Sequence, residues 1–195
     1  SGGDHRVVGL GHGSWPGPVA AKFGVAQWVN GDIDERNLDL LQQQGGAPDV
    51  VYHLAGGSAV GPSIASPVED FERTVHTTVR LLDWLRTRSP HTPLVAVSSA
   101  AVYGAGHAGP IREDTPHTPF SPYGHHKSVM EMLCRSYAST YGLRIAVARV
   151  FSAYGRDLRK QLLWDLCCRL HAGETQLVLD GTGAEVRDWI HVDDV

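Results

Sequence analysis

Short apolar runs of strand length alternate with helix-like segments along most of this 195-residue chain. The strand-like runs are rich in β-branched residues and read HRVVGL, AQWVNGDI, DVVYHLAG, PLVAVSSA, LRIAVARVF and QLVLDG. Apolar spacing and glycine or proline ends predict helices between them, at residues 35–44, 67–88, 122–141 and 161–172. Strands that are apolar on both faces need cover on both sides. We therefore predict an α/β fold with a doubly wound parallel sheet.

The composition gives no electrostatic reason to expect a nucleic-acid partner, since the formal net charge is −4 and 19% of the residues are charged. The apolar runs are far shorter than the ~20 residues that a membrane-spanning helix needs. Three cysteines, two of them adjacent, are more typical of reduced thiols than of a disulfide framework. We expect a cytoplasmic protein that binds neither membrane nor nucleic acid.

The sequence SPYGHHK places Tyr123 and Lys127 four residues apart at the start of one predicted helix. Residues at this spacing share a helix face, with Cβ atoms about 5–6 Å apart. A free tyrosine, with a pKa near ~10, is a weak base at neutral pH, and a nearby ammonium lowers that pKa. The pair predicts general acid–base chemistry at Tyr123. The alternative is a surface pair without function.

Ser98 and Ser99 end the strand-like run that precedes this helix. In open α/β sheets, ligands bind beyond the carboxyl ends of the strands. We therefore expect Ser99 to hydrogen bond a substrate hydroxyl and hold it beside Tyr123, with simple strand capping as the alternative. The long, polar, proline-rich segment 104–121 is predicted to be a lid or substrate loop.

Eleven histidines raise the question of a metal site. His125 and His126 are adjacent, and on a helix their side chains diverge by about 100°, so the two cannot readily hold one ion. The histidine and cysteine spacings typical of zinc sites are absent from the sequence. We predict no metal ligands.

Several longer stretches occur in an order typical of one family. They read VNGDI, VVYHLAGGSAVGPS, VSSAAVYG followed by SPYGHHK, RVFSAYG and DGTGAEVRDWIHVDDV, and they span nearly all of the chain. In these motifs the chain resembles the extended short-chain dehydrogenases/reductases, specifically the NAD-dependent epimerase/dehydratase group that acts on nucleotide sugars. The resemblance implies a Rossmann fold with bound NAD or NADP, NAD being slightly favoured.

The resemblance also implies residue roles. Tyr123 would be the catalytic acid/base, Lys127 would lower its pKa and bind the nicotinamide ribose, and Ser99 would bond the reacting oxygen. The residues implied at the cofactor are Asp32, Ile33, Leu54, Ala55, Gly56, Tyr123, Lys127 and Val150. Those implied at the nucleotide-sugar substrate are Ser99, Ser152 and Arg187, the last pairing with a phosphate.

The family's glycine-rich cofactor turn does not match GLGHG, because Ser14 stands where the third glycine would fall. Two prolines follow in SWPGP, where the pyrophosphate-binding helix should begin. Gly11 stands where the family often has an acidic residue for the adenosine ribose, and His12 or Ser14 could instead face a 2′-phosphate. We expect residues 1–195 to be part of a Rossmann domain that lacks its first strand and a C-terminal substrate domain. That piece alone should neither bind NAD(P) tightly nor turn over.

Other positions depart from the family pattern. Thr74 and Ser152 stand where the family commonly has asparagine, and Ala100 and Ala101 stand where the 4,6-dehydratases carry Asp-Glu. Elimination of water needs an acid and a base, which two methyl groups cannot supply. The preferred hypothesis is therefore a nucleotide-sugar 4-epimerase. The alternatives are a 4-keto nucleotide-sugar reductase and, in another class, a binding module that keeps the fold without turnover.

The predicted helices 67–88 and 122–141 carry apolar residues on more than one face, with Leu81 and Trp84 beside Leu82 and Leu85. In the family such helices form a two-fold dimer bundle, so the resemblance implies a homodimer. The alternative is that these side chains are buried inside the monomer.

Overall fold

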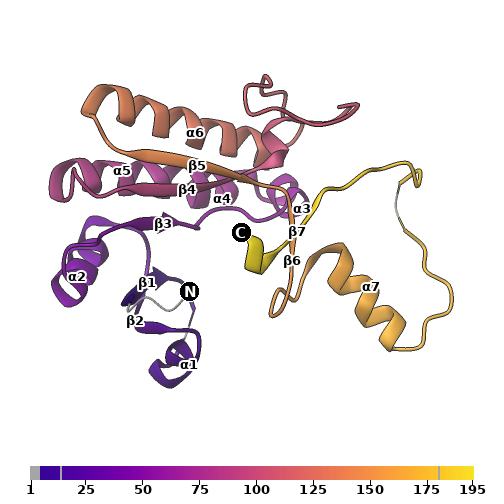
Figure 1. Ribbon diagram of the computed structural model, residues 1–195, viewed down its shortest axis with the longest axis horizontal. Helices are drawn as coiled ribbons and strands as arrows, with labels where there is room; N and C mark the ends of the chain where they lie inside the picture. The colour runs from indigo at the N-terminus through magenta and orange to yellow at the C-terminus, as the bar shows by residue number, and fades with distance from the viewer. Residues whose placement is uncertain (1–4, 14, 180) are drawn as a thin grey trace. The chain divides into compact units, whose positions relative to one another are not determined.

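The computed structural model describes residues 5–13, 15–179 and 181–195, and its chain divides into two compact units, Ser1–Arg149 and Val150–Val195 (Figure 1). The strands are β1 (Val7–Gly11), β2 (Val25–Asn30), β3 (Val51–His53), β4 (Leu94–Ser99), β5 (Ile145–Val150), β6 (Ser152–Tyr154) and β7 (Trp189–His191). The helices are α1 (Gly17–Lys22), α2 (Glu35–Gly45), α3 (Val60–Ala65), α4 (Pro67–Phe71), α5 (Thr77–Arg88), α6 (Pro122–Tyr141) and α7 (Gln161–His171). A π-helical segment, η1 (Glu72–His76), joins α4 to α5, and the 3₁₀ segments are η2 (Ala100–Val102) and η3 (Val192–Asp194).

The strands pair in parallel, and the predicted α/β class is confirmed. In the first unit, β1 pairs with β2, and β3 pairs with β4 in a sheet of order β3-β4-β5. In the second unit, β6 pairs in parallel with β7, with Ser152 opposite Trp189. The carboxyl ends of β3 and β4 therefore lie at one edge of their sheet, which is where a Rossmann-type fold carries its site.

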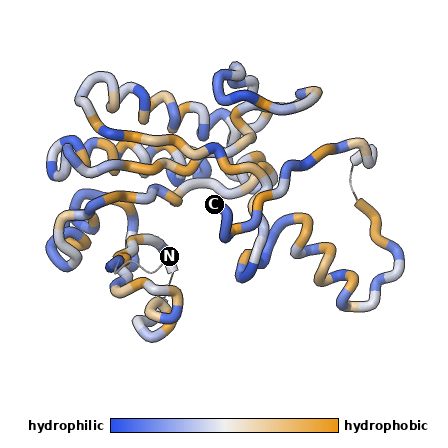
Figure 2. Tube along the Cα trace, viewed as in Figure 1, coloured by the Kyte–Doolittle hydropathy of each residue, from blue (hydrophilic) through white to orange (hydrophobic). Residues whose placement is uncertain are grey.

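The core of the first unit lies on one face of the β3-β4-β5 sheet. Burial alternates along β4, so that Leu94 and Ala96 are buried while Val95 and Val97 are only half-buried. Helices α2, α5 and α6 supply most of the other core residues: Leu38, Leu81, Leu82, Trp84, Leu85, Met130 and Cys134. Figure 2 shows hydrophobic residues gathered along the strands of this sheet. Burying each large apolar side chain stabilises the fold by about 1.5–3 kcal/mol.

The predicted helix at 67–88 is continuous in the structure, as α4, η1 and α5 together. The helix predicted at 122–141 has the same bounds as α6. Leu81 and Trp84, with 3% and 5% of their surface exposed, are buried inside the chain together with Leu82 and Leu85. Burial in the monomer thus accounts for the residues that had indicated a dimer face.

The strand predicted at 176–181 is wrong. The run is apolar, but its described residues form no strand, and Val178 and Leu179 are 82% and 53% exposed. An apolar run becomes a strand only where a partner strand takes up its main-chain hydrogen bonds. Asp180, within this run, lies outside the described residues. The short elements α1, α3, β6 and β7 were not predicted.

The glycines and prolines near the amino end have local structural reasons. A Cβ on Gly9 would lie 2.7 Å from the Trp28 indole, and one on Gly11 would lie 2.9 Å from it, so both glycines in β1 make room for that ring. Pro16 precedes α1 and Pro18 lies in its first turn, where a missing N–H costs nothing. The prolines therefore begin a helix, which the sequence analysis did not allow for. Ser14 lies outside the described residues.

Among the described residues, no helix combines the length and the apolar character needed to cross a bilayer.

Candidate active site

Ser99 is the last residue of β4, at the carboxyl end of that strand. Its Oγ accepts a hydrogen bond from the main-chain nitrogen of Ala101 at 3.2 Å and so caps η2. Its half-buried side chain lies close enough to Tyr123 to lower the pKa of that phenol. The strand end thus brings a hydroxyl near the predicted catalytic tyrosine.

Tyr123 lies in the first turn of α6, and the local sequence explains why the helix begins there. Ser121 is the N-cap, and its Oγ accepts from the main-chain nitrogen of Gly124 at 3.2 Å. Pro122 follows in the first turn, where its fixed backbone angle suits a helix start. Cap and proline together fix the position of the tyrosine in the first turn.

Two tertiary contacts then fix this helix start beside the strand end. The main-chain nitrogen of Tyr123 donates to the Oγ of Ser63, a fully buried residue of α3, at 3.0 Å. A Cβ on Gly124 would lie 2.6 Å from the carbonyl oxygen of Ala101. Only glycine allows the first turn of α6 to approach the residues after Ser99 so closely.

Lys127 follows Tyr123 by one turn and is 4% exposed. Its Nζ lies 6.0 Å from the centre of the Tyr123 ring and donates to the carbonyl oxygen of Val97 at 2.9 Å. The structure therefore brings Ser99, Tyr123 and Lys127, which the sequence places on two separate elements, into one cluster.

The pKa of Tyr123 is raised in this structure, whereas Lys127 was expected to lower it. Burial is the largest cause, the Ser99 side chain lowers this pKa, and the carboxylate of Asp70 raises it further. Burial also lowers the pKa of Lys127, while Asp70 and Glu131 raise it. Removing either side chain from water disfavours its charged form, and this effect dominates for both groups.

The segment after β3 fits a ligand that approaches the main chain closely. Gly56 has a φ of 134°, and a Cβ there would lie 3.2 Å from both Lys127 Nζ and Thr74 Oγ1. Thr74, which stands in place of the family's asparagine, accepts from the main-chain nitrogen of Gly57 at 2.8 Å. Ala55 is half-buried, and Leu54 is 72% exposed. The predicted residues Leu54, Ala55 and Gly56 thus form a turn in which two residues are small and Gly56 lies against Lys127, as a bound nicotinamide cofactor would require.

Asp32 and Ile33 follow β2, in the other sheet of this unit. Asp32 is exposed, and its Oδ1 lies 2.7 Å from Nε2 of His12, which follows the end of β1. The side chain of Ile33 packs against the hydrophobic core. Asp32 and Ile33 therefore lie at the carboxyl end of β2, and Asp32 contacts His12 at the carboxyl end of β1. An adenosine group would meet the sheet at these strand ends.

An ion pair beside the tyrosine and lysine was not predicted from the sequence. Nδ1 of His126 on α6 lies 2.6 Å from Oδ2 of Asp70 on α4, and the two side chains are 16% and 6% exposed. A Cβ on Gly57 would lie 1.8 Å from Asp70 Oδ1, so the carboxylate packs against the main chain of the turn after β3. The pair joins α4, α6 and that turn.

A sequence signal for this pair existed in the spacing of polar residues. Asp70, Thr74 and Thr78 recur every four residues along the helix, and all three are buried. Each has a partner at the site: His126 for Asp70, the nitrogen of Gly57 for Thr74, and His53 for Thr78. A polar stripe on an otherwise apolar helix indicates a buried network rather than a solvated face.

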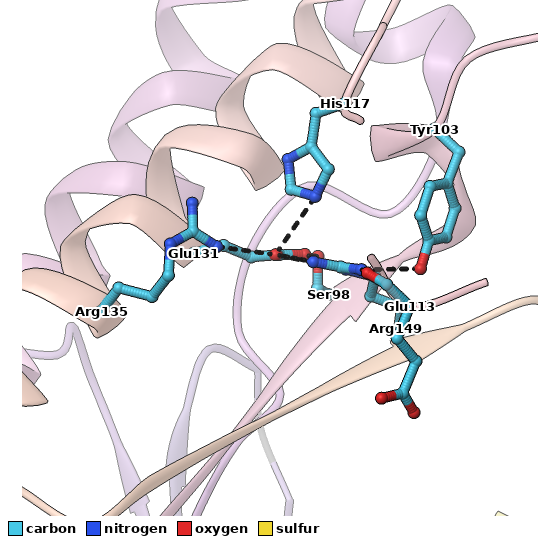
Figure 3. Close-up of polar contacts among 7 residues, drawn as sticks. All are labelled: Ser98, Tyr103, Glu113, His117, Glu131, Arg135 and Arg149. Atoms are coloured by element: carbon cyan, nitrogen blue, oxygen red, sulfur yellow. Dashed lines mark hydrogen bonds and ion pairs between the residues drawn. The ribbon is translucent and has the colours of Figure 1, made fainter. Parts of the chain in front are cut away.

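A second polar cluster surrounds Glu131, one turn after Lys127 (Figure 3). Its carboxylate has no exposed surface, accepts from Ser98 Oγ at 2.6 Å, and accepts from Arg149 Nε and Nη2 at 3.0 and 2.8 Å. Arg135 and His117 lie 3.4 and 3.6 Å from the same carboxylate. The cluster ties α6 to the residue before Ser99.

Arg149 also anchors the loop 104–121. As predicted, this loop forms neither helix nor strand. Arg149 Nη1 donates to the carbonyl oxygen of Glu113 and to the hydroxyl of Tyr103, both at 2.6 Å (Figure 3). His117 reaches Glu131 from within the loop. The loop is therefore held at its middle and near its end by buried charges.

The buried histidine His53 makes a hydrogen bond within the protein. His53 is 2% exposed and bonds Thr78 Oγ1 at 2.9 Å, and burial together with the charge of Lys127 lowers its pKa to about 4. In the part of the chain that the structure describes, no group of three His, Cys, Asp or Glu side chains could hold a metal ion.

Three predicted site residues belong to the second unit. Val150 ends β5 and is half-buried, and Ser152 begins β6, where its main-chain nitrogen donates to the carbonyl oxygen of Asp188 at 3.1 Å. Arg187, next to Asp188, is exposed. Within this unit, Ser152 and Arg187 thus lie near each other along the β6–β7 pairing.

Comparison with known sequences gives a consistent result. A statistical model of one family, described as the NAD dependent epimerase/dehydratase family, matches residues 1–195. A UDP-glucose 4-epimerase from Azospirillum brasilense is 31% identical over 183 residues, which cover 86% of this chain and 52% of that protein. A dTDP-glucose 4,6-dehydratase from Xanthomonas campestris is 33% identical over 177 residues, covering 86% and 50%. The chain thus spans about half the length of these curated relatives.

Solved structures show the same fold. A UDP-glucuronic acid 4-epimerase from Bacillus cereus, in complex with UDP-glucuronic acid and NAD, has a TM-score of 0.83 at 27% identity, covering 96% of this chain and 62% of that one. The dTDP-glucose 4,6-dehydratase DesIV from Streptomyces venezuelae, a double mutant with NAD and DAU bound, has a TM-score of 0.78 at 34% identity, covering 91% and 54%.

Proposed function

Because the chain belongs to the NAD-dependent epimerase/dehydratase family, we propose that it carries the catalytic residues of a nucleotide-sugar 4-epimerase that works with bound NAD. The observation that carries the proposal is the cluster at the carboxyl end of β4, where the Ser99 side chain lies close to Tyr123 and Lys127 lies one turn further along α6. The relatives include both epimerases and dehydratases of nucleotide sugars, which supports this substrate class.

The proposed chemistry is reversible oxidation at one sugar carbon. Tyr123 takes the proton of the sugar hydroxyl while hydride leaves the same carbon, and a carbonyl forms. Ser99 holds that oxygen against the tyrosine, and Lys127 supplies positive charge beside it. A nicotinamide cofactor, held near Gly56 and Lys127, would supply the hydride acceptor and donor. Tyr123 would return the proton to the same oxygen when the carbonyl is reduced from its opposite face, which gives the epimer.

A 4,6-dehydratase is disfavoured by the residues after Ser99. Ala100 and Ala101 form η2 directly beside the proposed reacting atoms and offer only methyl groups there. Elimination of water needs an additional acid and base close to the sugar. The alanines support a reaction confined to hydride and hydroxyl-proton transfer.

A 4-keto nucleotide-sugar reductase would use the same three side chains. The two activities differ in their use of the cofactor, since an epimerase recycles it and a reductase consumes it. A non-catalytic binding module would not need Ser99, Tyr123 and Lys127 in one cluster, so the assembled cluster supports an enzyme.

The experiment uses the full-length protein that contains this chain. UDP-glucose and dTDP-glucose are each incubated without added reductant, and formation of the 4-epimer is followed by NMR. We expect epimerisation, with a loss of about 10²–10⁴-fold in the Tyr123→Phe variant. A variant that kept most of its turnover would contradict the assignment. Turnover that requires added NADH would favour the reductase.

NAD is preferred to NADP for two reasons. The similar epimerase and dehydratase structures contain NAD. In addition, His12 is already paired with the Asp32 carboxylate, so the structure does not offer it as a free cation for a 2′-phosphate. For the substrate, Arg187 is proposed to pair with a phosphate of the nucleotide, and Ser152 to bond the same molecule.

A homodimer is proposed from the family and from exposed apolar side chains on the long helices. Val68 and Phe71 on α4, and Met132 and Tyr141 on α6, are 74%, 42%, 55% and 51% exposed. Sedimentation of the full-length protein tests this proposal, and charged substitutions at Phe71 and Met132 should shift it to monomer. The cytoplasm remains a prediction from composition.

A further inference from the structure

Lys127 presents an electrostatic problem. Its ammonium is almost fully buried, and its one described hydrogen bond goes to a neutral acceptor, the carbonyl oxygen of Val97. A charge removed from water is strongly destabilising unless an opposite charge lies near it. Two buried carboxylates, those of Glu131 and Asp70, act on the lysine electrostatically. Which of them balances its charge depends on their other partners.

Glu131 is already committed to another cation. Arg149 binds it through two guanidinium nitrogens, and Ser98 adds a hydrogen bond (Figure 3). Although burial opposes ionisation, the hydrogen bonds from Arg149 and Ser98 lower the pKa of Glu131. Arg135 adds further positive charge at 3.4 Å. The carboxylate of Glu131 is thus balanced without Lys127.

Asp70 has no arginine partner among the described residues. Its Oδ2 is held by Nδ1 of His126, and its Oδ1 faces the main chain at Gly57. The preceding glycine, Gly56, lies against Lys127 Nζ. Asp70 and Lys127 therefore lie against neighbouring residues of the same turn.

We infer that Asp70, fixed by His126, is the counter-ion of Lys127 and a positioning residue for Tyr123 and Lys127. The inference concerns charge balance in this chain, and only its catalytic consequence rests on the proposed function. Asp70 holds the ammonium in the charged state beside Tyr123. His126 donates Nδ1–H to it, which orients the carboxylate and joins α4 to α6.

The consequence for Tyr123 has a definite sign. Among the described residues, the titratable groups that face Tyr123 and Lys127 are Asp70 from α4, His53 from β3, and His126 and Glu131 from α6. The negative charge of Asp70 raises the pKa values of both Tyr123 and Lys127. Asp70→Asn should therefore lower both values while leaving the side-chain shape almost unchanged.

A tyrosine titration tests the inference without any substrate. The full-length protein is labelled with ¹³C at tyrosine Cζ, and the Tyr123→Phe variant assigns the signal. We expect the titration midpoint of Tyr123 to move to lower pH in Asp70→Asn and to stay unchanged in His125→Ala. His125 is the matched control, because it is the neighbouring, exposed histidine of α6. An unchanged midpoint in a folded Asp70→Asn protein would overturn the inference.

A double-mutant cycle provides a second test should Asp70→Asn alone fold poorly. Asp70→Asn, Lys127→Met and the double variant are unfolded in urea. A counter-ion pair predicts that each single change leaves one buried charge unbalanced, so that the double variant is more stable than the two single losses added together. Additive losses would refute the pairing.

A third measurement links the inference to turnover. The rising limb of kcat/KM against pH should move to lower pH in Asp70→Asn, because oxidation needs the phenolate of Tyr123. If the full-length protein shows no epimerase activity, the proposed function fails while the titration and the cycle still decide the counter-ion.

Discussion

Arg149 holds the fully buried carboxylate of Glu131 with Nε and Nη2, at 3.0 and 2.8 Å, and this pair lies one helical turn from Lys127. The two bonds form the forked arrangement that guanidinium and carboxylate groups favour. Because Ser98 and the loop 104–121 are bound to the same pair, the contact links the strand end, α6 and the loop.

Glu131→Gln should lower the free energy of unfolding by about 3–5 kcal/mol, because it leaves Arg149 without a counter-charge in the interior. Arg135→Ala is the control, since the Arg135 side chain is 60% exposed, and removal of its contact should cost less than about 1 kcal/mol. Urea unfolding at pH 7 measures both. Equal losses in the two variants would show that Glu131 is not specifically held by Arg149.

The same pair predicts acid sensitivity. Hydrogen bonds lower the pKa of folded Glu131 below its usual 4.5, so its stabilising contribution is complete above pH 4.5 and is lost as the pH falls through the lowered value. The difference in unfolding free energy between wild type and Glu131→Gln should therefore shrink below pH 4.5. Acid titrations followed by circular dichroism test this, and a constant difference would contradict it.

Protonation of His53 should lower the free energy of unfolding at a higher pH than protonation of Glu131 does. Its pKa is lowered from 6.5 to about 4 in the folded chain. The unfolded chain binds more protons between these values, so the free energy of unfolding falls as the pH drops from about 6.5 towards 4, by up to about 3 kcal/mol. Urea unfolding at pH 7.5 and 5 should show a smaller fall in His53→Gln than in wild type. Exposed His125→Gln should behave as wild type.

Gly124→Ala should move the first turn of α6 away from the residues that follow Ser99. The new Cβ would lie 2.6 Å from the carbonyl oxygen of Ala101, and relief of that clash costs about 1–3 kcal/mol. Gly61→Ala is the matched control, because a Cβ at Gly61 in α3 meets nothing within 4 Å and alanine favours a helix by about 1 kcal/mol. In thermal unfolding, we expect Gly124→Ala to destabilise the protein and Gly61→Ala to stabilise it. Equal effects of the two changes would argue against close packing at Ala101.

Ser99→Ala should shift the pH dependence of turnover in the full-length protein. The Ser99 side chain lowers the pKa of Tyr123, so its loss should move the rising limb of kcat/KM to higher pH. Ser98→Ala should reduce stability, because it removes a bond to Glu131, but should leave that limb in place. A shift in both variants would indicate a general disturbance of the strand end.

The sequence predicted the elements that combine strong periodicity with clear ends. The helix from Pro122 to Tyr141 was predicted to the residue because a serine–proline start and a glycine end enclose it. The run QLVLDG was misread because apolar character alone does not supply a partner strand. Pairing is a long-range property that local residues do not encode.

The identities of the candidate site residues were predictable from the sequence, but the electrostatic effects on them were less so. The spacing of Tyr123 and Lys127, and the strand ending at Ser99, correctly placed three groups together. The pKa of Tyr123 is raised by burial, and the sequence does not reveal this effect because burial depends on the tertiary contacts around the ring. The pair of Asp70 and His126 joins residues that are 56 positions apart, so the polar spacing around Asp70 indicates that it is buried without identifying its partner.

The indole of Trp28 lies across Gly9 and Gly11 and requires glycine at both positions. This packing explains why GLGHG resembles a nucleotide-binding fingerprint without being one. Bulkier residues at these two positions would displace Trp28 and loosen the small amino-terminal sheet. Enzymes altered there could lose turnover through misfolding, and such a loss would be easily mistaken for a defect in dinucleotide recognition. Intrinsic tryptophan fluorescence would separate the two causes before any kinetic constant is interpreted.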